Sequence, residues 1–583
     1  MIGPEPVLVE PTRVAPASAA RPVAHSSNPP IASPVLRALA APGMYRGHPA
    51  VEVHETHASW VFLAGRFAYK VKKPVRLAFL DYSTLARRLA ACQEEVRVNG
   101  ELAPGIYLGV RAIVPTEGGF RLAPRDAPGA VEYAVHMRRF DDADTLQGAI
   151  DEHSLTRAQV EKVALRLADF HRDCARCAGG EPERLLVAWE ANLRELERLD
   201  HPRDWYLQMM RGFAEAFVSA HRDEIERRVR AGEVRDGHGD LRCEHVLLGS
   251  EVRVVDRIEF DPKLRQMDIA RDLAFLAMDL EAHGRRRAAR ELIGAYQRAG
   301  GNPASEQLHS FYCAYWALVR AKVAVIAAGT QHGRLRHRER ARASRLWRLA
   351  QRFCWRARQP VAIIVCGTAG SGKSTLAAEL ARRSRLPIAS SDAIRKRRAG
   401  LGPTERARPE HYTSQFTRTV YDLLSRETLA QLERTGGVIV DATCHRRSER
   451  AKLFRLLNRS DLTFVVVRCQ VTLETALARA SARMRSAGRI SDATPEVVAA
   501  QFHRFQALDE LPAISVLSLD AEQSTNAQAT EVIRAVDDRM RDRARLVGTD
   551  CGVSMTESRA CHRCSPRERR PAWELRSFAT TSF

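Results

Sequence analysis

The stretch from Gly367 to Ser374 combines glycines, a lysine and a serine at a spacing that suits phosphate chemistry. Its sequence, GTAGSGKS, matches the pattern G-x-x-x-x-G-K-[ST]. An apolar strand is predicted before it, over residues 361–365, and helical spacing follows it over residues 375–383. Glycines let the backbone N–H groups curl around a phosphate chain at the N-terminus of a helix. Because strand, loop and helix occur in this order, the sequence predicts a nucleoside triphosphate site.

Each position of this loop has an expected role. Lys373 is expected to reach the β- and γ-phosphates of ATP, and the hydroxyl of Ser374 to bind Mg²⁺. ATP and Mg²⁺ are therefore the predicted cofactors. The other positions are expected to contact ATP through the loop backbone, and they are Gly367, Thr368, Ala369, Gly370, Ser371 and Gly372.

A carboxylate follows the next predicted strand, which begins near Leu386. Asp392 is placed where a general base could take the proton of an acceptor hydroxyl. Arg395, three residues later, could hold the substrate or a phosphate. The alternative is that Asp392 only caps the N-terminus of the following helix. The two roles are compatible, and the sequence does not separate them.

Two further features fit the same site. Residues 436–443 form a third apolar strand that carries Asp441, which suits a ligand of Mg²⁺ or of its water. After a fourth strand over residues 462–469, an arginine-bearing helical segment lies where small kinases carry a lid. Arg483 is the preferred lid arginine and Arg479 the second choice. The alternative is that both are surface arginines of an arginine-rich chain.

Alternation of strands with helices predicts a parallel sheet covered by helices on both faces. The elements resemble the group of P-loop kinases that includes polynucleotide kinase, chloramphenicol phosphotransferase and zeta-toxin-like domains. That resemblance implies phosphoryl transfer from ATP to an acceptor.

A second set of candidate residues lies in the first half of the chain. Residues 57–75 are typical of two strands, the second of which carries Lys70. Residues 85–102 have helical spacing and carry Glu95, which the spacing to Val98 and Leu102 favours over Glu94. Further strands are expected over residues 106–114 and 131–137. Strand lysine, helix glutamate and further strands follow one another as in a protein-kinase small lobe.

The middle of the chain carries a more specific motif. His238-Gly-Asp240 begins the stretch HGDLRCEHVLL, and the following strand ends at Asp256. A helix with Asp272 comes next. Here the sequence resembles the aminoglycoside phosphotransferase-like family, which shares the bilobal fold of choline kinases and protein kinases. The resemblance covers about residues 45–340, and the family pattern is H-G-D-x-x-x-x-N followed by a metal-binding Asp.

This resemblance implies roles for particular residues. Asp240 would be the catalytic base that accepts the proton of a substrate hydroxyl. Asp256 would hold Mg²⁺, Lys70 would contact the α- and β-phosphates, and Glu95 would pair with Lys70.

The sequence departs from the family pattern at His245, which stands where the pattern places a metal-binding Asn. Mg²⁺ prefers oxygen ligands, so an imidazole is a poor replacement. A lobe that binds a ligand without phosphoryl transfer is therefore the alternative to an active one. The chain also resembles bacterial two-domain proteins in which such a lobe, with the form HGDLRxEHV, precedes a P-loop kinase. On that resemblance, His245 belongs to the pattern of the group.

Composition narrows the class of protein. With 583 residues and 45% hydrophobic content, the chain is expected to fold into several globular units. No run approaching the roughly 18–20 apolar residues of a membrane span is recognised, the start of the chain does not resemble a signal peptide, and the 12 cysteines are scattered. We therefore expect a cytoplasmic protein without membrane contact. The pairs Cys174/Cys177 and Cys561/Cys564 have C-x-x-C spacing, but neither has a second pair at zinc-finger distance, so we do not expect them to bind a metal.

The formal charge of +21 could indicate a nucleic-acid partner. However, most of the basic residues are arginines spread along the chain, so this indication is weak. Residues 339–358 form an arginine-dense amphipathic helix, which could bind RNA or serve as a linker helix packed between domains. The linker is the favoured interpretation.

The expected fold class is an α+β kinase-like bilobal domain followed by an α/β P-loop domain. The expected units are a disordered tail over residues 1–42, a kinase-like domain over 43–340, a helical linker over 341–358, a P-loop domain over 359–545 and a tail over 546–583. The predicted function is transfer of the γ-phosphoryl group of ATP to a small-molecule alcohol. Two alternatives remain open: a regulatory ATP-binding protein with a non-catalytic kinase-like lobe, and an RNA-end kinase.

Overall fold

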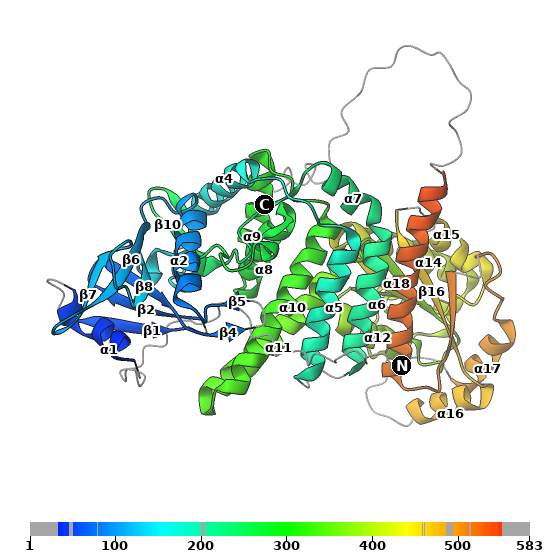
Figure 1. Ribbon diagram of the computed structural model, residues 1–583. Helices are drawn as coiled ribbons and strands as arrows, with labels where there is room; N and C mark the ends of the chain where they lie inside the picture. Colours follow the sequence, from blue (N-terminus) through cyan, green and yellow to red (C-terminus); the bar gives the residue numbers. More distant parts are fainter. Residues whose placement is uncertain are drawn as a thin grey trace, which may run out of the picture.

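The computed structural model describes residues 33–45, 50–56, 58–77, 80–199, 204–457, 459, 461–484, 494–511 and 515–550. Figure 1 shows an antiparallel sheet at one end of the molecule, a helical region in the middle and a parallel sheet with its helices at the other end. This is the predicted class: a kinase-like α+β domain followed by an α/β P-loop domain.

The first lobe is built on a six-stranded antiparallel sheet with the order β1-β2-β3-β8-β6-β7. Gly65, with a φ of 56°, lies in the turn between the two strands predicted from the sequence. The N-cap of α2 is Thr84, whose hydroxyl accepts a hydrogen bond from Arg87 N. The elements of this lobe are α1 (Pro34–Ala40), η1 (Pro42–Met44), β1 (Val51–Glu55), β2 (Ser59–Ala64), β3 (Phe67–Lys72), β4 (Arg76–Leu77), β5 (Leu80–Asp81), α2 (Leu85–Gly100), β6 (Tyr107–Thr116), β7 (Gly119–Pro124) and β8 (Glu132–Arg138).

The boundary that we expected at residue 42 is wrong. Helix α1 buries Leu36 and Leu39 in the same cluster as Phe62 and Val71 of the sheet. The proline- and alanine-rich composition suggested a disordered tail. However, Leu36 and Leu39 are three residues apart, so they lie on the same side of the helix and can pack together on the apolar sheet. Residues 1–32 lie outside the described part of the chain.

The second lobe is mainly helical and holds the largest core of the protein. Short strand pairs, β9 with β12 and β10 with β11, frame the HGD motif within it. Its elements are η2 (Asp142–Asp144), α3 (Leu146–Asp151), α4 (Arg157–Asp173), α5 (Pro182–Arg198), α6 (Asp204–Ala220), α7 (Arg222–Arg230), β9 (Val234–Asp236), η3 (Cys243–His245), β10 (Val246–Leu248), β11 (Val252–Val254), η4 (Pro262–Leu264), β12 (Gln266–Asp268), α8 (Ile269–Ala282), α9 (Arg286–Arg298), α10 (Glu306–Thr330) and α11 (Gly333–Ala357).

Two helices of this lobe differ from expectation. The expected linker helix is the second half of α11, and its residues Leu346, Leu349 and Phe353 are buried in the lobe core. Helix α10 is long and apolar enough, by length and composition, to cross a membrane, a feature that the sequence analysis missed. However, 67% of its apolar window is buried inside the protein, which is how a core helix of a folded domain behaves.

The P-loop domain is a five-stranded parallel sheet with the order β14-β15-β13-β16-β17. Its central strands are apolar throughout because helices cover both faces, with separate buried clusters on either side. The four strands predicted from the sequence are present, and β17 was not foreseen. The elements are β13 (Val361–Cys366), α12 (Lys373–Ser384), β14 (Ile388–Ser390), α13 (Ser391–Arg398), η5 (Pro409–Tyr412), α14 (Ser414–Thr435), β15 (Gly437–Asp441), α15 (Arg447–Leu457), β16 (Thr463–Gln470), α16 (Leu473–Met484), α17 (Pro495–Arg504), β17 (Val516–Asp520) and α18 (Thr525–Asp550).

The two domains are packed together through their helices. Helix α18 of the P-loop domain lies along α6 of the kinase-like domain, side by side with it in Figure 1. Met540 of α18 is buried in the core of the helical lobe, and Met209 of α6 packs against a core cluster of the P-loop domain. Helix α18 extends to Asp550, past the expected boundary at residue 545. Residues 551–583 lie outside the described part of the chain.

Candidate active sites

The kinase-like domain brings Lys70, Glu95 and Asp256 together from three elements. The Nζ atom of Lys70, on β3, lies 2.8 Å from Glu95 Oε1 on α2 and 2.9 Å from Asp256 Oδ1 after β11. The neighbouring Glu94 instead pairs with Arg97 and Arg265 on the outer side. Asp256 has a φ of 62°, and its backbone N–H donates to the Tyr107 hydroxyl at 3.1 Å. The left-handed backbone turns the Asp256 carboxylate toward Lys70.

Sequence reasoning missed a second lysine in this site. Lys72 is 1% exposed, and its Nζ lies 2.5 Å from Glu95 Oε2 and forms a further ion pair with Glu259. Tyr82 donates from its hydroxyl to Glu259. Lys70 and Lys72 are two residues apart on one strand and therefore share a face, which was the only available signal. Together they tie β3 to the loop after β11.

These charges hold one another in their ionised forms. Burial alone would lower the pKa of Lys70, but Asp256 and Glu95 raise it well above its usual value. Burial opposes ionisation of Asp256, yet Lys70 and His245 hold the pKa of Asp256 well below its usual range. Glu95 behaves likewise: against the effect of burial, Lys70 and Lys72 lower its pKa. The site is therefore a permanently charged network.

The loop with the HGD motif is held by a buried carboxylate. Asp272 on α8 accepts hydrogen bonds from the backbone N–H groups of His238, at 2.6 Å, and Gly239, at 3.0 Å. The ring of His238 bonds through Nε2 to the carbonyl of Val255 at 3.0 Å, and burial lowers the pKa of His238 to about 4. Asp272 and His238 therefore position Asp240 beside Asp256 through the backbone.

Asp240 lies in contact with Arg242 and His245. The Nε and Nη2 atoms of Arg242 are 3.0 Å from the two carboxylate oxygens of Asp240, one each. His245 Nδ1 is 2.8 Å from the Asp240 carbonyl, and Nε2 is 3.6 Å from Asp256 Oδ2. Burial raises the pKa of Asp240, while Arg242 acts to lower it. The residues that the sequence predicted for this site thus lie together in one place. Arg242, to which the sequence analysis gave no role, lies in contact with two of them.

The P-loop also adopts a phosphate-binding geometry. Gly367, Gly370 and Gly372 have φ angles of 147°, 84° and 85°, which side chains rarely tolerate. A Cβ atom on Gly370 would lie 2.6 Å from the backbone oxygen of Ala476 on α16. Lys373 opens α12, so the loop leads straight into the N-terminus of a helix. The buried hydroxyl of Ser371 has no hydrogen-bond partner among the described residues.

The sheet register places the predicted carboxylates beside the loop. Ser390 at the end of β14 pairs with Asp441 at the end of β15, and Asp441 pairs with Val365 of β13. The P-loop follows β13 directly, so all three strand ends meet at the carboxyl edge of the sheet, where α/β proteins bind their ligands. Asp441 is 8% exposed, and its Oδ1 has no hydrogen-bond partner in the described part of the chain.

Asp392 is not the N-cap residue of helix α13. Ser390 is the N-cap residue of α13, and its hydroxyl accepts from Ala393 N at 3.5 Å. Asp392 lies one residue into the helix, with 37% of its side chain exposed, and Lys396 Nζ is 3.8 Å away. Arg395 is buried, donates to the His411 carbonyl and covers the Tyr412 ring.

Helices α16 and α17, in the region where the sequence analysis expected a lid, contact the P-loop. Arg479 Nη1 lies 3.7 Å from the position of a Cβ on Gly372, and Arg479 Nη2 donates to the Ala521 carbonyl at 3.0 Å. Gln501 on α17 accepts a hydrogen bond from Ala369 N at 2.9 Å, and nothing in the sequence pointed to it. Arg483 falls on the last turn of α16, but its side chain lies outside the described part of the structure.

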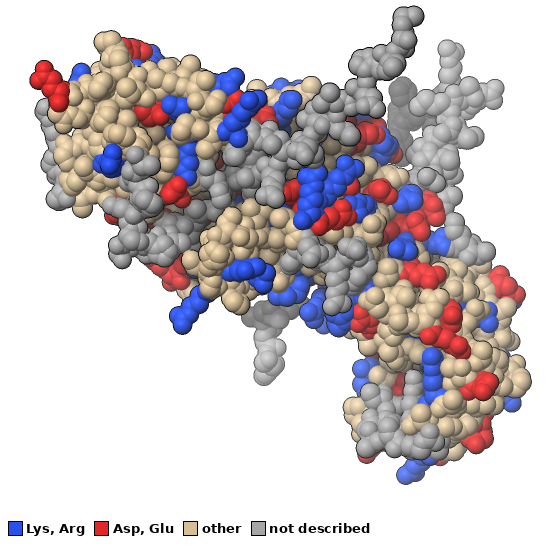
Figure 2. All heavy atoms as spheres, turned by 60° about the horizontal axis from the view of Figure 1, so that its bottom comes forward, with Lys and Arg blue, Asp and Glu red and all other residues tan. Residues whose placement is uncertain are grey.

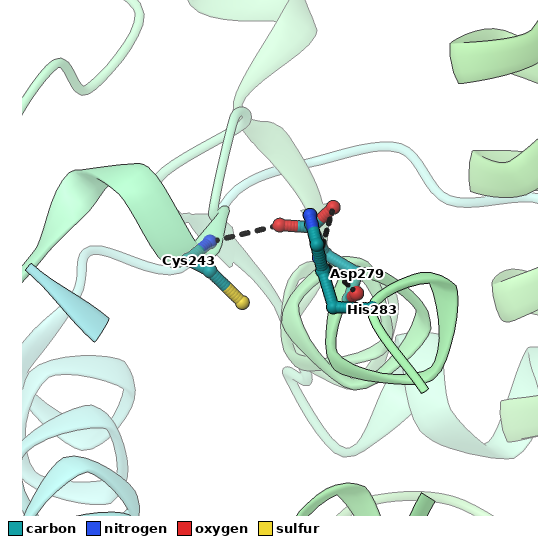
Figure 3. A group of neighbouring side chains, drawn as sticks. All are labelled: Cys243, Asp279 and His283. Carbon is teal, nitrogen blue, oxygen red and sulfur yellow. Dashed lines mark hydrogen bonds and ion pairs between the residues drawn. The ribbon is translucent and has the colours of Figure 1, made fainter. Parts of the chain in front are cut away.

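A further group of potential metal ligands lies next to the HGD loop. Figure 3 shows Cys243, Asp279 and His283, whose ligand atoms lie within 4.8 Å of one another. Asp279 Oδ2 already accepts a hydrogen bond from Cys243 N at 2.9 Å, and His283 Nδ1 donates to the Asp279 carbonyl. Burial and the Asp279 charge raise the pKa of Cys243 well above its usual value, so the thiol stays protonated. We assign Asp279 a structural role as the acceptor that anchors the loop.

Comparison with known proteins identifies the family to which the chain belongs. An uncharacterised protein of Mycobacterium tuberculosis (strain ATCC 25618 / H37Rv), Rv2004c, is 32% identical over 466 residues, which span 78% of this chain and 89% of the relative. The chain belongs to the Rv2004c family. An uncharacterised protein of Mycobacterium bovis matches to the same extent. The model of a family described as an AAA domain matches residues 363–508, which contain the P-loop, Asp392 and Asp441 of this family member.

Solved structures show weak likeness to parts of this chain. A choline/ethanolamine kinase family protein from Mesorhizobium loti is 16% identical, over 54% of this chain and 92% of that chain, with a TM-score of 0.34. The ADP-bound aminoglycoside phosphotransferase APH(2'')-Ib is 14% identical, over 55% and 99%, with a TM-score of 0.31. A gluconokinase from Sinorhizobium meliloti 1021 is 18% identical, over 33% and 97%, with a TM-score of 0.22. Nothing about the substrate of the Rv2004c family follows from likeness at this level.

Proposed function

We propose that the P-loop domain transfers the γ-phosphoryl group of ATP to a hydroxyl group of a small molecule. The observation that carries this proposal is the sheet register. It sets the strand ends with Asp441 and Ser390 next to the strand that opens the P-loop. A phosphate cradle, a metal-binding carboxylate and a base at one edge of a sheet are the parts that phosphoryl transfer needs.

Each residue has a role in this reaction. The backbone N–H groups of the loop and Lys373 hold the phosphates, so that the γ-phosphoryl group faces the acceptor. Asp392, exposed at the start of α13, accepts the proton of the attacking hydroxyl. Arg479, beside Gly372, offsets the negative charge that develops on the transferred group. Positioning and charge neutralisation supply most of the catalysis, with little covalent work by the protein.

The residues present also suit Mg²⁺. Ser374 and Asp441 offer oxygen ligands, and the buried Oδ1 of Asp441 lacks a hydrogen-bond partner among the described residues. When bound there, Mg²⁺ would neutralise phosphate charge.

For the kinase-like domain we propose a second phosphotransferase site, with Asp240 as the base and Lys70 as the phosphate ligand. A non-catalytic, ligand-binding lobe is the second candidate, and one observation favours it. Arg242 engages both carboxylate oxygens of Asp240, which would have to release it before accepting a proton. In that case nucleotide binding at the P-loop would regulate what the lobe binds.

An RNA-end kinase receives less support. Figure 2 shows blue basic side chains interleaved with red acidic ones on the face in view, without one continuous basic surface. Many basic residues are already in ion pairs, including Arg211 with Glu190 and Arg222 with Glu183. Phosphate-backbone binding needs unmatched positive charge on one face.

The test is phosphoryl transfer from γ-labelled ATP to a pool of cell metabolites and, separately, to RNA. It compares the wild type with Lys373→Ala and Asp240→Ala. We expect labelled small molecules that disappear with Lys373→Ala. Loss with Asp240→Ala alone would assign the activity to the kinase-like domain instead. Absence of labelling in the wild type, together with ATP binding, would favour the regulator. Labelled RNA, lost steeply with added salt, would favour the RNA enzyme.

A further inference from the structure

Arg395, on α13 of the P-loop domain, is a buried arginine without an acidic partner among the described residues. It is 8% exposed. Its Nη1 atom donates to the His411 carbonyl at 2.6 Å and lies 3.4 Å from the Thr417 hydroxyl, and the guanidinium group covers the Tyr412 ring, 4.6 Å from the centroid. All three contacts are with neutral groups. Buried arginines are ordinarily paired with carboxylates, because an uncompensated charge in the interior is costly. Arg395 is therefore a cation whose counter-ion must come from elsewhere.

The contacts of Arg395 leave part of its donor capacity unused. A guanidinium group has five N–H donors, and both hydrogen bonds of Arg395 start from Nη1. The Nε and Nη2 atoms have no hydrogen-bond partner in the described part of the chain. Two adjacent guanidinium nitrogens match two oxygens of a carboxylate or a phosphate. Because the neutral contacts already hold the side chain in place, little ordering is left to pay when an anion binds.

More arginines surround the same place from other elements. Burial lowers the pKa of His445, in the loop after β15, to about 4, and four nearby arginines act in the same direction, which are Arg446, Arg450, Arg504 and Arg395. Arg450 is matched by its ion pair with Glu510. Arg504, on the last turn of α17, is exposed and forms no ion pair within the residues that the structure describes. Positive charge thus converges from α13, from the loop after β15 and from the end of α17.

Glu449, on α15, is the carboxylate next to these arginines, and it does not neutralise Arg395. Its Oε1 atom is 4.0 Å from Arg446 Nε, which is too long for a hydrogen bond, and it forms no ion pair with Arg395. Its other oxygen, Oε2, lies 3.2 Å from His445 Nδ1. Burial raises the pKa of Glu449, although Arg446 acts to lower it. Glu449 is therefore a weak counter-ion that leaves Arg395 available to a ligand.

This group of arginines lies beside the residues proposed for phosphoryl transfer. Asp392, the proposed base, precedes Arg395 by three residues on α13. Their side chains therefore lie on the same side of the helix, about 4.5 Å apart along its axis. Arg446 follows β15, whose last residue is Asp441, the proposed ligand of Mg²⁺. An acceptor whose hydroxyl reaches Asp392 would place a neighbouring group of the same molecule beside Arg395.

We propose that the acceptor of the P-loop domain is a small hydroxyl-bearing anion, whose carboxylate or phosphate group binds to Arg395, with Arg446 and Arg504 at the exposed edge. The anionic group supplies the counter-charge that Arg395 lacks, and it orients the hydroxyl toward Asp392 without taking part in the chemical step. The proposal names the class of substrate for the function proposed above and rests on that function.

The first experiment asks which metabolites the protein labels. Small metabolites, freed of RNA by ultrafiltration, are split on an anion exchanger into retained and unretained fractions. Each fraction is incubated with the full-length protein, Mg²⁺ and γ-labelled ATP. We expect label to pass to compounds of the retained fraction, and label confined to the unretained fraction or to RNA would overturn the proposal. Treating the retained fraction with alkaline phosphatase, removed before the reaction, abolishes a phosphate-bearing acceptor and spares a carboxylate-bearing one.

Variants then test the arginines. Arg395→Met removes the charge, Arg395→Lys keeps it, and Arg397→Met is the matched control on α13, because Arg397 is 63% exposed and pairs with Glu427. We expect Arg395→Met to lower kcat/KM for the labelled acceptor at least about tenfold, which is the effect of losing a charge-assisted hydrogen bond. Arg395→Lys should restore part of it, and Arg397→Met should behave like the wild type. The KM for ATP should not change, since Arg395 binds the acceptor.

Unchanged acceptor kinetics in Arg395→Met, or an equal rise in its KM for ATP, would overturn the proposal. Circular dichroism checks that the variant folds. If it does not, the exposed Arg446 decides: Arg446→Ala should raise the KM for the acceptor, and an unchanged KM would overturn the proposal.

A binding measurement separates this proposal from the proposed function. The full-length protein, with Mg²⁺ and a non-hydrolysable ATP analogue that fills the P-loop, is unfolded by heat in the presence of glycerol, glycerate or glycerol 3-phosphate at equal ionic strength. We expect at least one of the two anions to raise the Tm of the wild type and of Arg397→Met but not of Arg395→Met, and glycerol to have no effect. Such a shift without labelling of any metabolite would reject the phosphotransferase function alone. No shift with either anion and no labelling would reject both proposals.

Discussion

Arg358 at the end of α11 forms a buried, two-pronged ion pair with Asp537 of α18. The Nε–Oδ1 and Nη2–Oδ2 distances are 2.7 and 2.9 Å, and both side chains are less than one-tenth exposed. The guanidinium group also lies over the ring of Phe213 on α6, 4.3 Å from the ring centroid. One arginine therefore touches the helical lobe, the connection between the domains and the last helix of the P-loop domain.

Arg358→Ala is expected to destabilise the full chain by about 3–5 kcal/mol, because Asp537 is then left buried without its partner. Thermal unfolding followed by circular dichroism measures the effect. The matched control is Arg459→Ala, which breaks an exposed pair with Asp461 and should cost no more than about 1 kcal/mol. Equal shifts for the two variants would show that the Arg358 pair does not hold the domains together.

Lys72→Met is expected to cost about 3–5 kcal/mol, since it leaves Glu259 buried without its lysine and takes one of two cations from Glu95. Chemical denaturation should show the loss in the transition of the kinase-like domain. Lys452→Met is the control, because its pair with Asp422 is about half exposed on both sides. A Lys72 variant as stable as this control would contradict the interpretation of Lys72 as a tie between β3 and the loop after β11.

Arg479→Ala is expected to lower kcat about 10²- to 10³-fold with a smaller change in the KM for ATP, because the charge that it offsets develops in the transition state. Steady-state kinetics with the acceptor found by γ-phosphoryl labelling measures both constants. Arg382→Ala is the control and should change neither, because Arg382 lies on α12 with an exposed side chain that pairs with Glu379. A rise in KM with an unchanged kcat would instead make Arg479 a ground-state nucleotide ligand.

The stability of the helical lobe is expected to fall as the pH drops below about 6.5. His309 on α10 is buried, and burial lowers its pKa to about 4 from the ordinary 6.5, against the smaller effects of the Pro303 backbone and of Glu281. Between these two values the unfolded chain takes up a proton that the folded chain does not, so acid favours unfolding in that window.

His309→Leu should therefore lose less stability than the wild type between pH 7 and pH 5, measured by denaturation at both values. His337→Leu changes an exposed histidine of α11 and should behave like the wild type. An identical pH response in the wild type and His309→Leu would show that His309 does not contribute to the acid sensitivity.

Many of the candidate site residues could be predicted from the sequence because they belong to motifs whose residues are close together in the chain. The glycines and lysine of the P-loop, and the HGD motif, need their spacing to curl a backbone or to set a base beside a metal ligand, so residues close in sequence report them. The apolar strands before Gly367 and Asp441 follow from the same local periodicity, because a parallel strand buried on both faces is apolar throughout.

Other features depend on partners that lie far apart in the chain. Glu259 pairs with Lys72, 187 positions away in the sequence, and Gln501 accepts a hydrogen bond from Ala369, 132 positions away. No local sequence pattern predicts either contact. Composition misled at residues 34–40, where two leucines pack on an apolar sheet. At α11 the amphipathic pattern was visible in the sequence, but only the fold showed that its apolar side belongs to the core of the helical lobe.

By itself, then, the sequence determined that a kinase-like domain precedes a P-loop domain in this protein, and where the HGD motif and the P-loop lie. Only the tertiary structure decided that Arg242 pairs with Asp240, that the ring of His245 lies between Asp240 and Asp256, and that α18 packs against α6 of the other domain. The physical reason is that spacing fixes local backbone geometry, whereas burial and charge pairing depend on which distant segments pack together.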